Sequence, residues 1–263
     1  MLKAGRIVFG VLAVLFLVAP LLAILPLAFT SSVFLNYPVP SYSLRWFEEL
    51  LNAEVWRRSI INSLIIGGGA TVLATVLGTL AALGLRSRHL PFAGLFRTIF
   101  LLPMVVPAVV LGVGMQLCFV QIDLASTYLG VIVAHSVLAI PFVLVNVSAS
   151  LGGIDPRVER AAASLGASPT TVFRRVTLPL ALPGVVSGAA FAFATSLDEV
   201  VLTLFVAGPN QRTLARQMFS SIRENISPAI AAAAFLFIVG TLIVGGMSLL
   251  VRARLRTRVV MPE

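Results

Sequence analysis

The sequence predicts an all-α integral membrane protein with six transmembrane helices and both termini on the cytoplasmic side. Hydrophobic residues make up 59% of its 263 residues and charged residues only 11%, and the mean hydropathy is +1.03. A soluble domain of this length has too little interior to cover that much apolar surface. Six apolar stretches are each long enough to cross a hydrocarbon core, which takes about 20 helical residues.

These six stretches are expected to form a single transmembrane domain over residues 1–263. Helices are expected because a span has to satisfy its own backbone hydrogen bonds inside the bilayer. The first span resembles a signal peptide, but it is too long, and Pro20 and Pro26 occupy the region where cleavage would occur. We therefore expect a retained helix. The predicted spans are Ile7–Phe29, Ile60–Leu85, Phe96–Phe119, Leu129–Leu151, Pro183–Val206 and Ala229–Val251.

The basic residues predict the orientation, because cytoplasmic loops carry an excess of Lys and Arg. The side that holds both termini has thirteen of the 19 basic residues, namely Lys3, Arg6, Arg86, Arg88, Arg97, Arg157, Arg160, Arg174, Arg175, Arg252, Arg254, Arg256 and Arg258. The other side has Arg45, Arg57, Arg58, Arg212, Arg216 and Arg223. The net charge of +9 is thus a sign of membrane orientation, and no nucleic acid partner is expected.

The sequence contains no set of residues that predicts catalysis. There is no Gly-x-x-x-x-Gly-Lys-Ser/Thr phosphate loop, so the chain is not expected to bind ATP. His89 and His135 are the only histidines, and no cysteine cluster accompanies them to hold a metal. Cys118 is the single cysteine, which excludes an intrachain disulfide. We expect a subunit that is not an enzyme and binds no cofactor.

Two further features concern the spans and the loop between the first pair. The segment Thr30–Ser59 lies outside the cell in this topology, and its Trp46, Phe47, Glu48 and Glu49 suggest a short interfacial helix. Glycines within the spans would let helices approach closely, although glycine is also common in membrane helices and this alternative accounts for about half of them. These glycines are Gly67, Gly68, Gly69, Gly78, Gly112, Gly114, Gly245 and Gly246.

The cytoplasmic loop Gly152–Leu182 predicts two short helices. Asp155 followed by Pro156 is a typical helix start, and Gly166 is a typical helix end. Between them, Val158, Ala161, Ala162 and Leu165 share one apolar face. Ser168 and Pro169 start the second helix, which Leu178-Pro179 is expected to end.

Two interpretations of this loop remain open on physical grounds. A rigid helix that connects two spans could transmit the motion of a docked partner, and the alanines at 161–163 would let that partner approach closely. The alternative is an amphipathic connector that rests on lipid.

The same loop resembles the EAA loop of binding-protein-dependent ABC importer permeases. That motif reads Glu-Ala-Ala, three residues, Gly, nine residues, Ile-x-Leu-Pro, and its spacing fits from Ala161 through Gly166 to Pro179 without a gap. Two positions differ: Arg160 occupies the usual Glu position, with Glu159 one place earlier, and Val176 replaces Ile.

The resemblance implies a type I ABC importer permease bundle in which this loop contains the coupling helix. It implies two separate ATPase subunits that use ATP and Mg²⁺, a second permease subunit that is a different chain, and an extracytoplasmic solute-binding protein. The chain would then be a multi-pass protein of the bacterial cytoplasmic (inner) membrane. The resemblance implies that the residues coupling this chain to the ATPase are Glu159, Arg160, Ala161, Ala162, Leu165, Gly166, Ala167, Ser168, Leu178 and Pro179.

Beyond the loop, the chain is similar to the second permease subunit of spermidine/putrescine importers. The likeness lies in Ala134-His135 with Pro141–Val143, in Ser196–Val201, in Phe205–Pro209 and in Ser227–Ala234. It implies a polyamine or a related cationic or zwitterionic solute. Opine, aminophosphonate and amino-acid-derivative permeases share much of the pattern and are alternatives.

The candidate residues of the transport path are Asp198, Glu199, His135 and Thr195. Asp198 and Glu199 are the only acids in a predicted span, and a charge facing lipid costs about 2.5–3.5 kcal/mol at the bilayer centre. They are therefore expected to face the bundle interior or water, unless they pair with a basic group or lie near the outer interface. For His135, a helix–helix hydrogen bond is the alternative to a gate or a solute contact.

Two other classes of function remain. A secondary transporter or channel would work without an ATPase, and a membrane scaffold would transport nothing. An ATPase that copurifies in mild detergent would favour the importer, and ion-gradient-driven uptake by this chain alone would favour the secondary transporter. A scaffold predicts that mutations in the path change no uptake.

Overall fold

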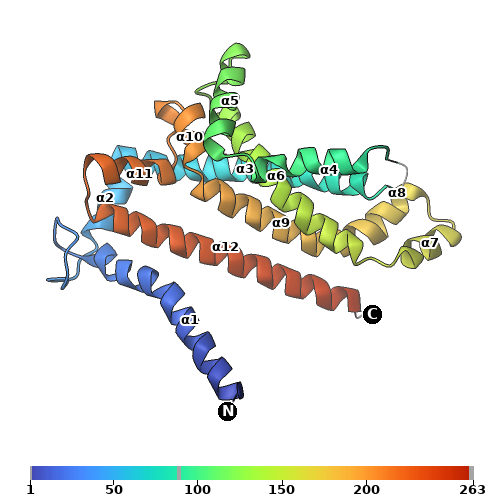
Figure 1. Ribbon diagram of the computed structural model, residues 1–263, viewed down its shortest axis with the longest axis horizontal. Helices are drawn as coiled ribbons and strands as arrows, with labels where there is room; N and C mark the ends of the chain where they lie inside the picture. The colour runs from blue at the N-terminus through green and yellow to red at the C-terminus, as the bar shows by residue number, and fades with distance from the viewer. Residues whose placement is uncertain (1, 88–89, 261–263) are drawn as a thin grey trace. The chain divides into compact units, whose positions relative to one another are not determined.

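The computed structural model describes residues 2–87 and 90–260, with side chains for residues 5–87 and 90–254. Arg88 and His89, and the side chains of Lys3, Arg256 and Arg258, lie outside the described residues. Helices dominate this part of the chain, with one isolated β-bridge between Thr30 and Tyr42 (Figure 1). The all-α fold class is therefore confirmed.

The helices fall into two compact units. One comprises Met1–Arg58 and Gln217–Gly240, and the other comprises Ser59–Arg216 and Thr241–Glu263. The first contains α1 (Leu2–Ile24), η1 (Pro26–Phe29), α2 (Arg45–Asn52) and parts of α3 (Glu54–Leu85), α11 (Leu214–Glu224) and α12 (Ala229–Val260). The second contains the rest of α3, α11 and α12 together with α4 to α10.

Three phenylalanine rings pack against one another in the first unit. Phe29 and Phe47 have ring centroids 5.1 Å apart, and Phe235 lies 5.1 Å from Phe29 and 5.6 Å from Phe47, edge-on to both. Edge-to-face rings at this spacing contribute beyond their buried area. They join η1, α2 and α12, and α2 is the short helix expected around Trp46.

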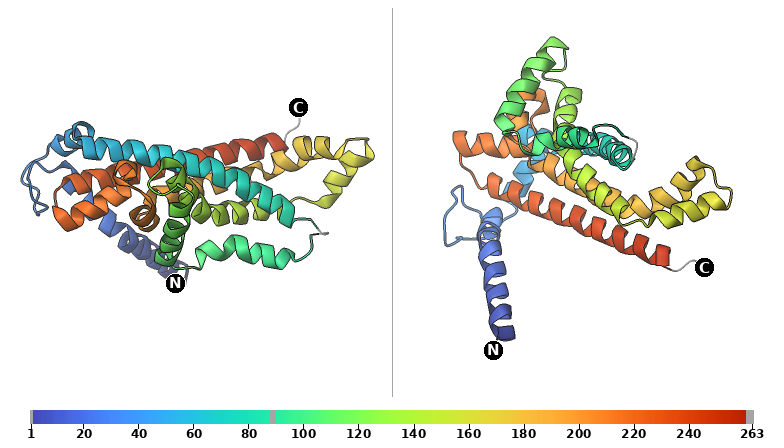
Figure 2. Two further views of the ribbon diagram at one scale, coloured as in Figure 1. Left: turned by 90° about the horizontal axis from the view of Figure 1, so that it is seen from above. Right: turned by 45° about the vertical axis from the view of Figure 1, so that its right-hand side comes forward.

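In the second unit, α6 (Tyr128–Gly152) and α9 (Leu178–Asp198) lie side by side (Figures 1 and 2). Val143, Leu144, Val147, Ala181 and Ala192 are buried in one hydrophobic cluster there. The other elements are α4 (Ala93–Leu101), η2 (Leu102–Met104), α5 (Ala108–Gln121), α7 (Pro156–Ser164), α8 (Pro169–Val172), the π-helical turn η3 (Phe173–Thr177), α10 (Val201–Val206) and η4 (Pro209–Gln211).

Five helical runs in the described residues are long and apolar enough to cross a membrane. They are Gly5–Phe29, Glu54–Leu85, Tyr128–Gly152, Pro169–Asp198 and Ala229–Arg254. A sixth span results only if Ala93–Met104 and Ala108–Gln121, which are bent by 101° to each other, count as one. The first, second, fourth and sixth predicted spans therefore correspond to continuous helices.

The third predicted span, Phe96–Phe119, is wrong as a continuous helix. The chain leaves the helix after Met104 and re-enters it at Ala108. Pro107 has no N–H to donate and disfavours a helical conformation for the residue before it, so the break falls where the proline requires it. Figure 1 shows α5 turned away from the direction of α4.

The fifth predicted span, Pro183–Val206, is not one continuous helix. Its helix starts earlier, at Pro169, and stops at Asp198. Glu199 is extended (φ −76°, ψ 113°), and the short helix α10 follows.

Leu178-Pro179 does not end the second loop helix, contrary to the prediction. α8 continues through the π-helical turn Phe173–Thr177 into α9. A proline in a helix crowds the carbonyl four residues earlier, which here belongs to Arg175. The wider π turn contains Arg175 and relieves that crowding, so the helix passes through Pro179.

Candidate functional site

The helix α7 has the ends that its sequence predicts. The Asp155 side chain accepts a hydrogen bond from the Arg157 N–H at 2.8 Å, and Pro156 occupies the first helical turn. Gly166 closes the helix with a φ of +84°, a left-handed conformation that favours glycine. The Ser168 hydroxyl then accepts from the Thr171 N–H at 3.3 Å and caps α8. Local side-chain chemistry therefore fixes both boundaries of α7.

The predicted apolar face of α7 is uncovered in this chain. Leu165 is 89% exposed and Val158 is 47% exposed. Ala161 between them is also exposed. Val158 borders a cleft of about 520 Å³ that Ile154 and Leu180 also line. α7 thus presents a small apolar surface next to a hollow, and Leu165 is its most exposed member.

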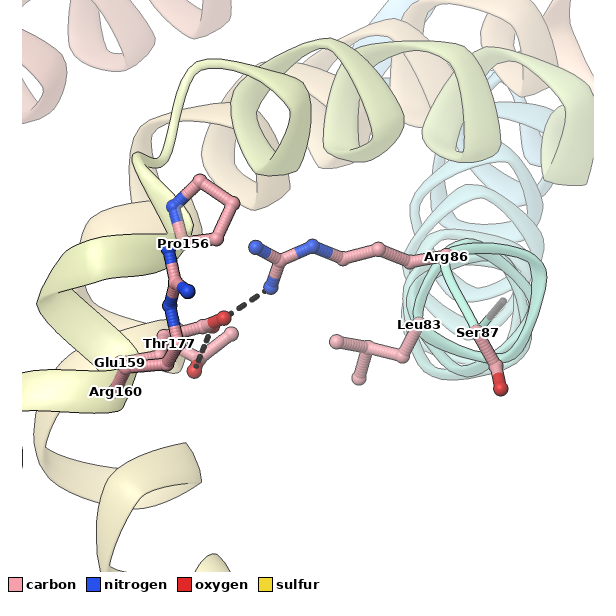
Figure 3. Close-up of a pocket in the computed structure, with 7 residues that line it drawn as sticks. All are labelled: Leu83, Arg86, Ser87, Pro156, Glu159, Arg160 and Thr177. Carbon is pink, nitrogen blue, oxygen red and sulfur yellow. Dashed lines mark hydrogen bonds and ion pairs between the residues drawn. The ribbon is translucent and has the colours of Figure 1, made fainter. Parts of the chain in front are cut away.

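Another side of α7 carries a three-residue polar contact, which we call the clasp: Arg86, Glu159 and Thr177. Arg86 follows the last residue of α3, and its Nη1 donates to Glu159 Oε1 at 2.7 Å. The Thr177 hydroxyl donates to the same oxygen at 2.6 Å. Figure 3 shows the Arg86 side chain extending from α3 to reach Glu159 on α7.

The clasp is partly shielded from water. The side chains of Arg86 and Glu159 are 28% and 24% exposed, and Thr177 is buried. Burial raises the pKa of the Glu159 carboxyl, but the hydrogen bonds from Arg86 and Thr177 outweigh it, so the pKa lies below its ordinary value of 4.5. Glu159 is therefore ionised at neutral pH and holds both donors.

A cleft of about 570 Å³ opens beside the clasp. It is lined by Leu83, Arg86, Ser87, Pro156, Glu159, Arg160 and Thr177 (Figure 3). Arg160 is exposed, whereas Glu159 is engaged by its two donors. The residue that replaces the usual Glu of the motif is therefore the one whose charge faces outward.

His135 is fully enclosed in the second unit. It is 1% exposed, and its Nδ1 lies 2.8 Å from the Ser196 hydroxyl while its Nε2 lies 3.0 Å from the Thr203 hydroxyl. Ser196 precedes the break at Glu199 and Thr203 follows it. His135 thus bridges α9 and α10 across the break, as the helix–helix alternative expected.

The two acids at the end of α9 have different surroundings. Glu199 Oε1 accepts the Leu202 N–H at 2.7 Å and so caps the start of α10. Asp198 is exposed, as the last residue of α9. Thr195 is half-buried one turn earlier. The four path candidates therefore gather around one helix break, and Asp198 is the member with an exposed carboxylate.

The coupling-loop residues and the path candidates lie at opposite ends of one helix. Leu178 begins α9 and Asp198 ends it, and this helix of 21 residues is about 30 Å long at 1.5 Å per residue. The continuous helix Pro169–Asp198 therefore connects the loop after α7 to the break near His135.

Sequence reasoning missed several contributors to these sites. Arg86 entered only the orientation count, because nothing in the sequence pairs it with a residue 73 positions away. Thr177 occupies the unspecified position of the Ile-x-Leu-Pro motif. Asn62 and Tyr128 were also missed: Asn62 Nδ2 donates to the carbonyls of Asn210 and Arg212, both at 2.9 Å, and Asn62 Oδ1 accepts from Tyr128 at 2.8 Å.

Comparison with known proteins gives concordant results. Residues 74–257 match the model of the family "Binding-protein-dependent transport system inner membrane component". The chain is 35% identical over 256 residues to the putrescine transport system permease protein PotI of Escherichia coli K12, with 95% of this chain and 91% of that protein covered. It is 33% identical over 217 residues to the spermidine/putrescine transport system permease protein PotC of Haemophilus influenzae, with 82% of each covered.

A further relative and a solved structure extend the comparison. PhnV of Salmonella paratyphi A, whose name assigns it to 2-aminoethylphosphonate transport, is 34% identical over 232 residues, with 87% of this chain and 86% of that protein covered. A crystal structure of a bacterial ABC transporter involved in alginate import aligns with a TM-score of 0.72 at 15% identity, covering 96% of this chain and 95% of that one. The fold is therefore that of ABC importer permeases. The chain belongs to the family of inner membrane components of binding-protein-dependent transport systems and is a multi-pass permease subunit.

Proposed function

We propose that this chain forms half of the solute path of an ABC importer in a bacterial inner membrane. A second, different permease chain supplies the other half, two ATPase subunits bind at the cytoplasmic face, and an extracytoplasmic binding protein delivers the solute. ATP and Mg²⁺ act in the ATPase subunits. The observation that carries this proposal is the uncovered apolar face of α7, with Leu165 89% exposed, on a helix anchored to the bundle by the clasp.

The coupling surface on α7 comprises the exposed residues Arg160, Ala161 and Leu165, with Ala162 beside them. The turn at Gly166 and the residues Ala167 and Ser168 fix where α8 leaves it. Leu178 and Pro179 lie in the continuous helix that leads from α8 into the bundle. A partner that moves α7 would thus act on α9 through the turn at Gly166 and the continuous helix that starts at Pro169.

The solute we propose is a polyamine such as putrescine or spermidine. Both PotI and PotC carry polyamines by their names. Asp198 stands at the C-terminal end of α9, where the helix dipole is already negative, and an acid at that end is unfavourable without a cation nearby. Glu199 adds a second carboxylate beside it. A solute with two or more ammonium groups would offset this local excess of negative charge.

A second candidate solute is 2-aminoethylphosphonate, because PhnV is 34% identical to this chain. That solute has one ammonium group and an anionic phosphonate. The negative end of α9 would attract the ammonium group and repel the phosphonate, so the polyamine is the better fit.

The function is tested in the host bacterium by deleting the gene for this chain and restoring a tagged copy. Uptake of radiolabelled putrescine should fall on deletion and return with the tagged chain, and an ATPase should copurify with the tag in mild detergent. Uptake that follows an ion gradient with no ATPase attached would overturn the importer. Loss of 2-aminoethylphosphonate uptake alone would replace the polyamine with the second candidate.

The Asp198→Asn substitution tests the solute contact. A hydrogen bond to a charged group contributes about 1.5–3 kcal/mol, so the KM for putrescine uptake should rise about tenfold or more. Glu199→Gln is the matched control, because the amide oxygen can still accept the Leu202 N–H, and it should change KM less. An unchanged KM in Asp198→Asn at normal expression would remove Asp198 from the path.

A further inference from the structure

The clasp joins three separate elements at a single oxygen atom. Arg86 comes from the end of α3, Glu159 from the middle of α7, and Thr177 from the π turn that leads into α9. Both donors bond to Oε1 of Glu159, at 2.7 and 2.6 Å. A charged hydrogen bond held in a half-buried place is stronger and better defined than a surface ion pair.

Among the described residues, the other side-chain hydrogen bonds of α7 stay within its own turns. Asp155 accepts from the Arg157 N–H and Ser164 donates to the Arg160 carbonyl. The helix is flanked by Gly152 and Gly153 on one side and by Gly166 on the other, and all three are exposed. Without Glu159, α7 would lose its polar ties to α3 and α9. Only its two glycine-containing ends and Ile154, which is buried just before it, would hold it, so α7 could rotate about them.

We propose that Glu159 is a positioning residue that makes α7 a rigid lever, by tying it to α3 through Arg86 and to α9 through Thr177. This inference rests on the proposed function, since a lever matters only if a partner moves it. A force applied to the uncovered face of α7 then reaches two helices of the bundle together. With the clasp broken, the partner still docks on Ala161 and Leu165, but part of its motion is lost in rotation of α7.

Breaking the clasp is expected to uncouple ATP hydrolysis from solute import. In Glu159→Gln or Arg86→Ala, the ATPase should copurify as with the unaltered chain. The amount of putrescine imported per ATP hydrolysed should fall about tenfold, because losing a charged hydrogen bond shifts the equilibrium between the held and the rotated α7 by about that factor. Thr177→Val keeps the side-chain shape and removes one of the two donors, so its effect should be smaller. Arg97→Ala is the matched control, because it removes an exposed arginine of α4 that is outside the clasp.

The decisive variant exchanges the charges, with Arg86→Glu and Glu159→Arg in one chain. The Thr177 hydroxyl can accept a hydrogen bond as well as donate one, so the exchanged pair should restore a large part of the ratio that each single reversal loses. The purified complex in lipid nanodiscs gives ATP turnover, and proteoliposomes with its binding protein give uptake of radiolabelled putrescine.

The outcomes separate the two proposals. If the unaltered complex shows no ATP-driven uptake, the proposed function fails. If the unaltered complex transports putrescine and the single variants keep the normal ratio of putrescine imported to ATP hydrolysed, the lever proposal is wrong but the importer function is supported. Loss of the ATPase from the purified single variants, with no recovery on charge exchange, would also overturn the lever, because Glu159 would then serve docking or folding.

Discussion

Replacing Gly184 with valine is expected to prevent the stable packing of α9 against α6. A Cβ atom at position 184 would lie 2.6 Å from the Asn146 carbonyl oxygen and would also clash with the Ser150 hydroxyl oxygen. The carbonyl belongs to the backbone of α6 and cannot move unless the helix moves. Overpacking costs typically 1–3 kcal/mol and occasionally more, and this backbone obstacle places Gly184→Val at about 3 kcal/mol or above.

The measurement is the amount of chain in the membrane fraction, followed by the temperature at which the detergent-solubilised protein loses its monodisperse elution peak. Gly114→Val is the matched control, because a Cβ at Gly114 of α5 meets nothing within 4 Å. Gly184→Val should accumulate poorly and lose its peak at a clearly lower temperature than this control. Equal behaviour of the two variants would show that α6 and α9 do not approach closely at Gly184.

The glycines show which close helix–helix contacts can be predicted from sequence. Of the eight glycines noted in the spans, Gly67, Gly69, Gly78 and Gly112 would each place a Cβ within 3.1 Å of a neighbouring side chain, whereas Gly68, Gly114, Gly245 and Gly246 meet nothing within 4 Å. Composition cannot separate these groups, because contact depends on which face meets a neighbour. Gly184 and Gly188 were missed, although their spacing of four is a known signal for close helix approach.

The prolines also show that a helix break cannot be predicted from sequence alone. α6 contains Pro141 and α9 contains Pro183 without a break, yet the chain leaves its helix before Pro107. In α6, the buried Pro141 is packed among other helices, which can compensate for the lost hydrogen bond. Proline alone therefore predicts a possible break, and tertiary contacts decide whether the helix continues.

The loop helices are the most predictable part of the candidate site. Asp155, Gly166 and Ser168 act on their own neighbours, so capping rules place α7 and the start of α8 correctly. The clasp could not be predicted in the same way. Glu159 and Arg86 are 73 residues apart, and the sequence contains no sign that the end of α3 passes α7. The role of a residue that contacts another helix can be identified only when the fold is known. The role of a residue that ends its own helix can be predicted from sequence.

Replacing His135 with alanine is expected to destabilise the helix break that carries the path candidates. The imidazole is 1% exposed and contacts hydroxyls on both sides of the break. Its removal leaves a cavity and deprives the Ser196 and Thr203 hydroxyls of a partner. Large-to-small core changes cost about 2–5 kcal/mol, although a hydrogen bond between membrane helices contributes only about 0.6–2 kcal/mol. We expect a net loss of about 2–4 kcal/mol.

A triple variant separates the hydrogen bonds from simple space filling. His135→Leu with Ser196→Ala and Thr203→Val removes all three polar partners while it keeps most of the volume, and replacing every partner by an apolar group can be nearly neutral. Its thermal stability in detergent should exceed that of His135→Ala.

Uptake gives a second readout of the same bridge. Asp198 and Glu199 lie in sequence between Ser196 and Thr203, the two residues that His135 joins. Neither His135→Ala nor the triple variant keeps these hydrogen bonds between α9 and α10, so both should impair putrescine transport. Normal uptake in the stable triple variant would mean that His135 contributes packing alone, and that the break keeps its shape through Glu199, whose carboxylate caps α10.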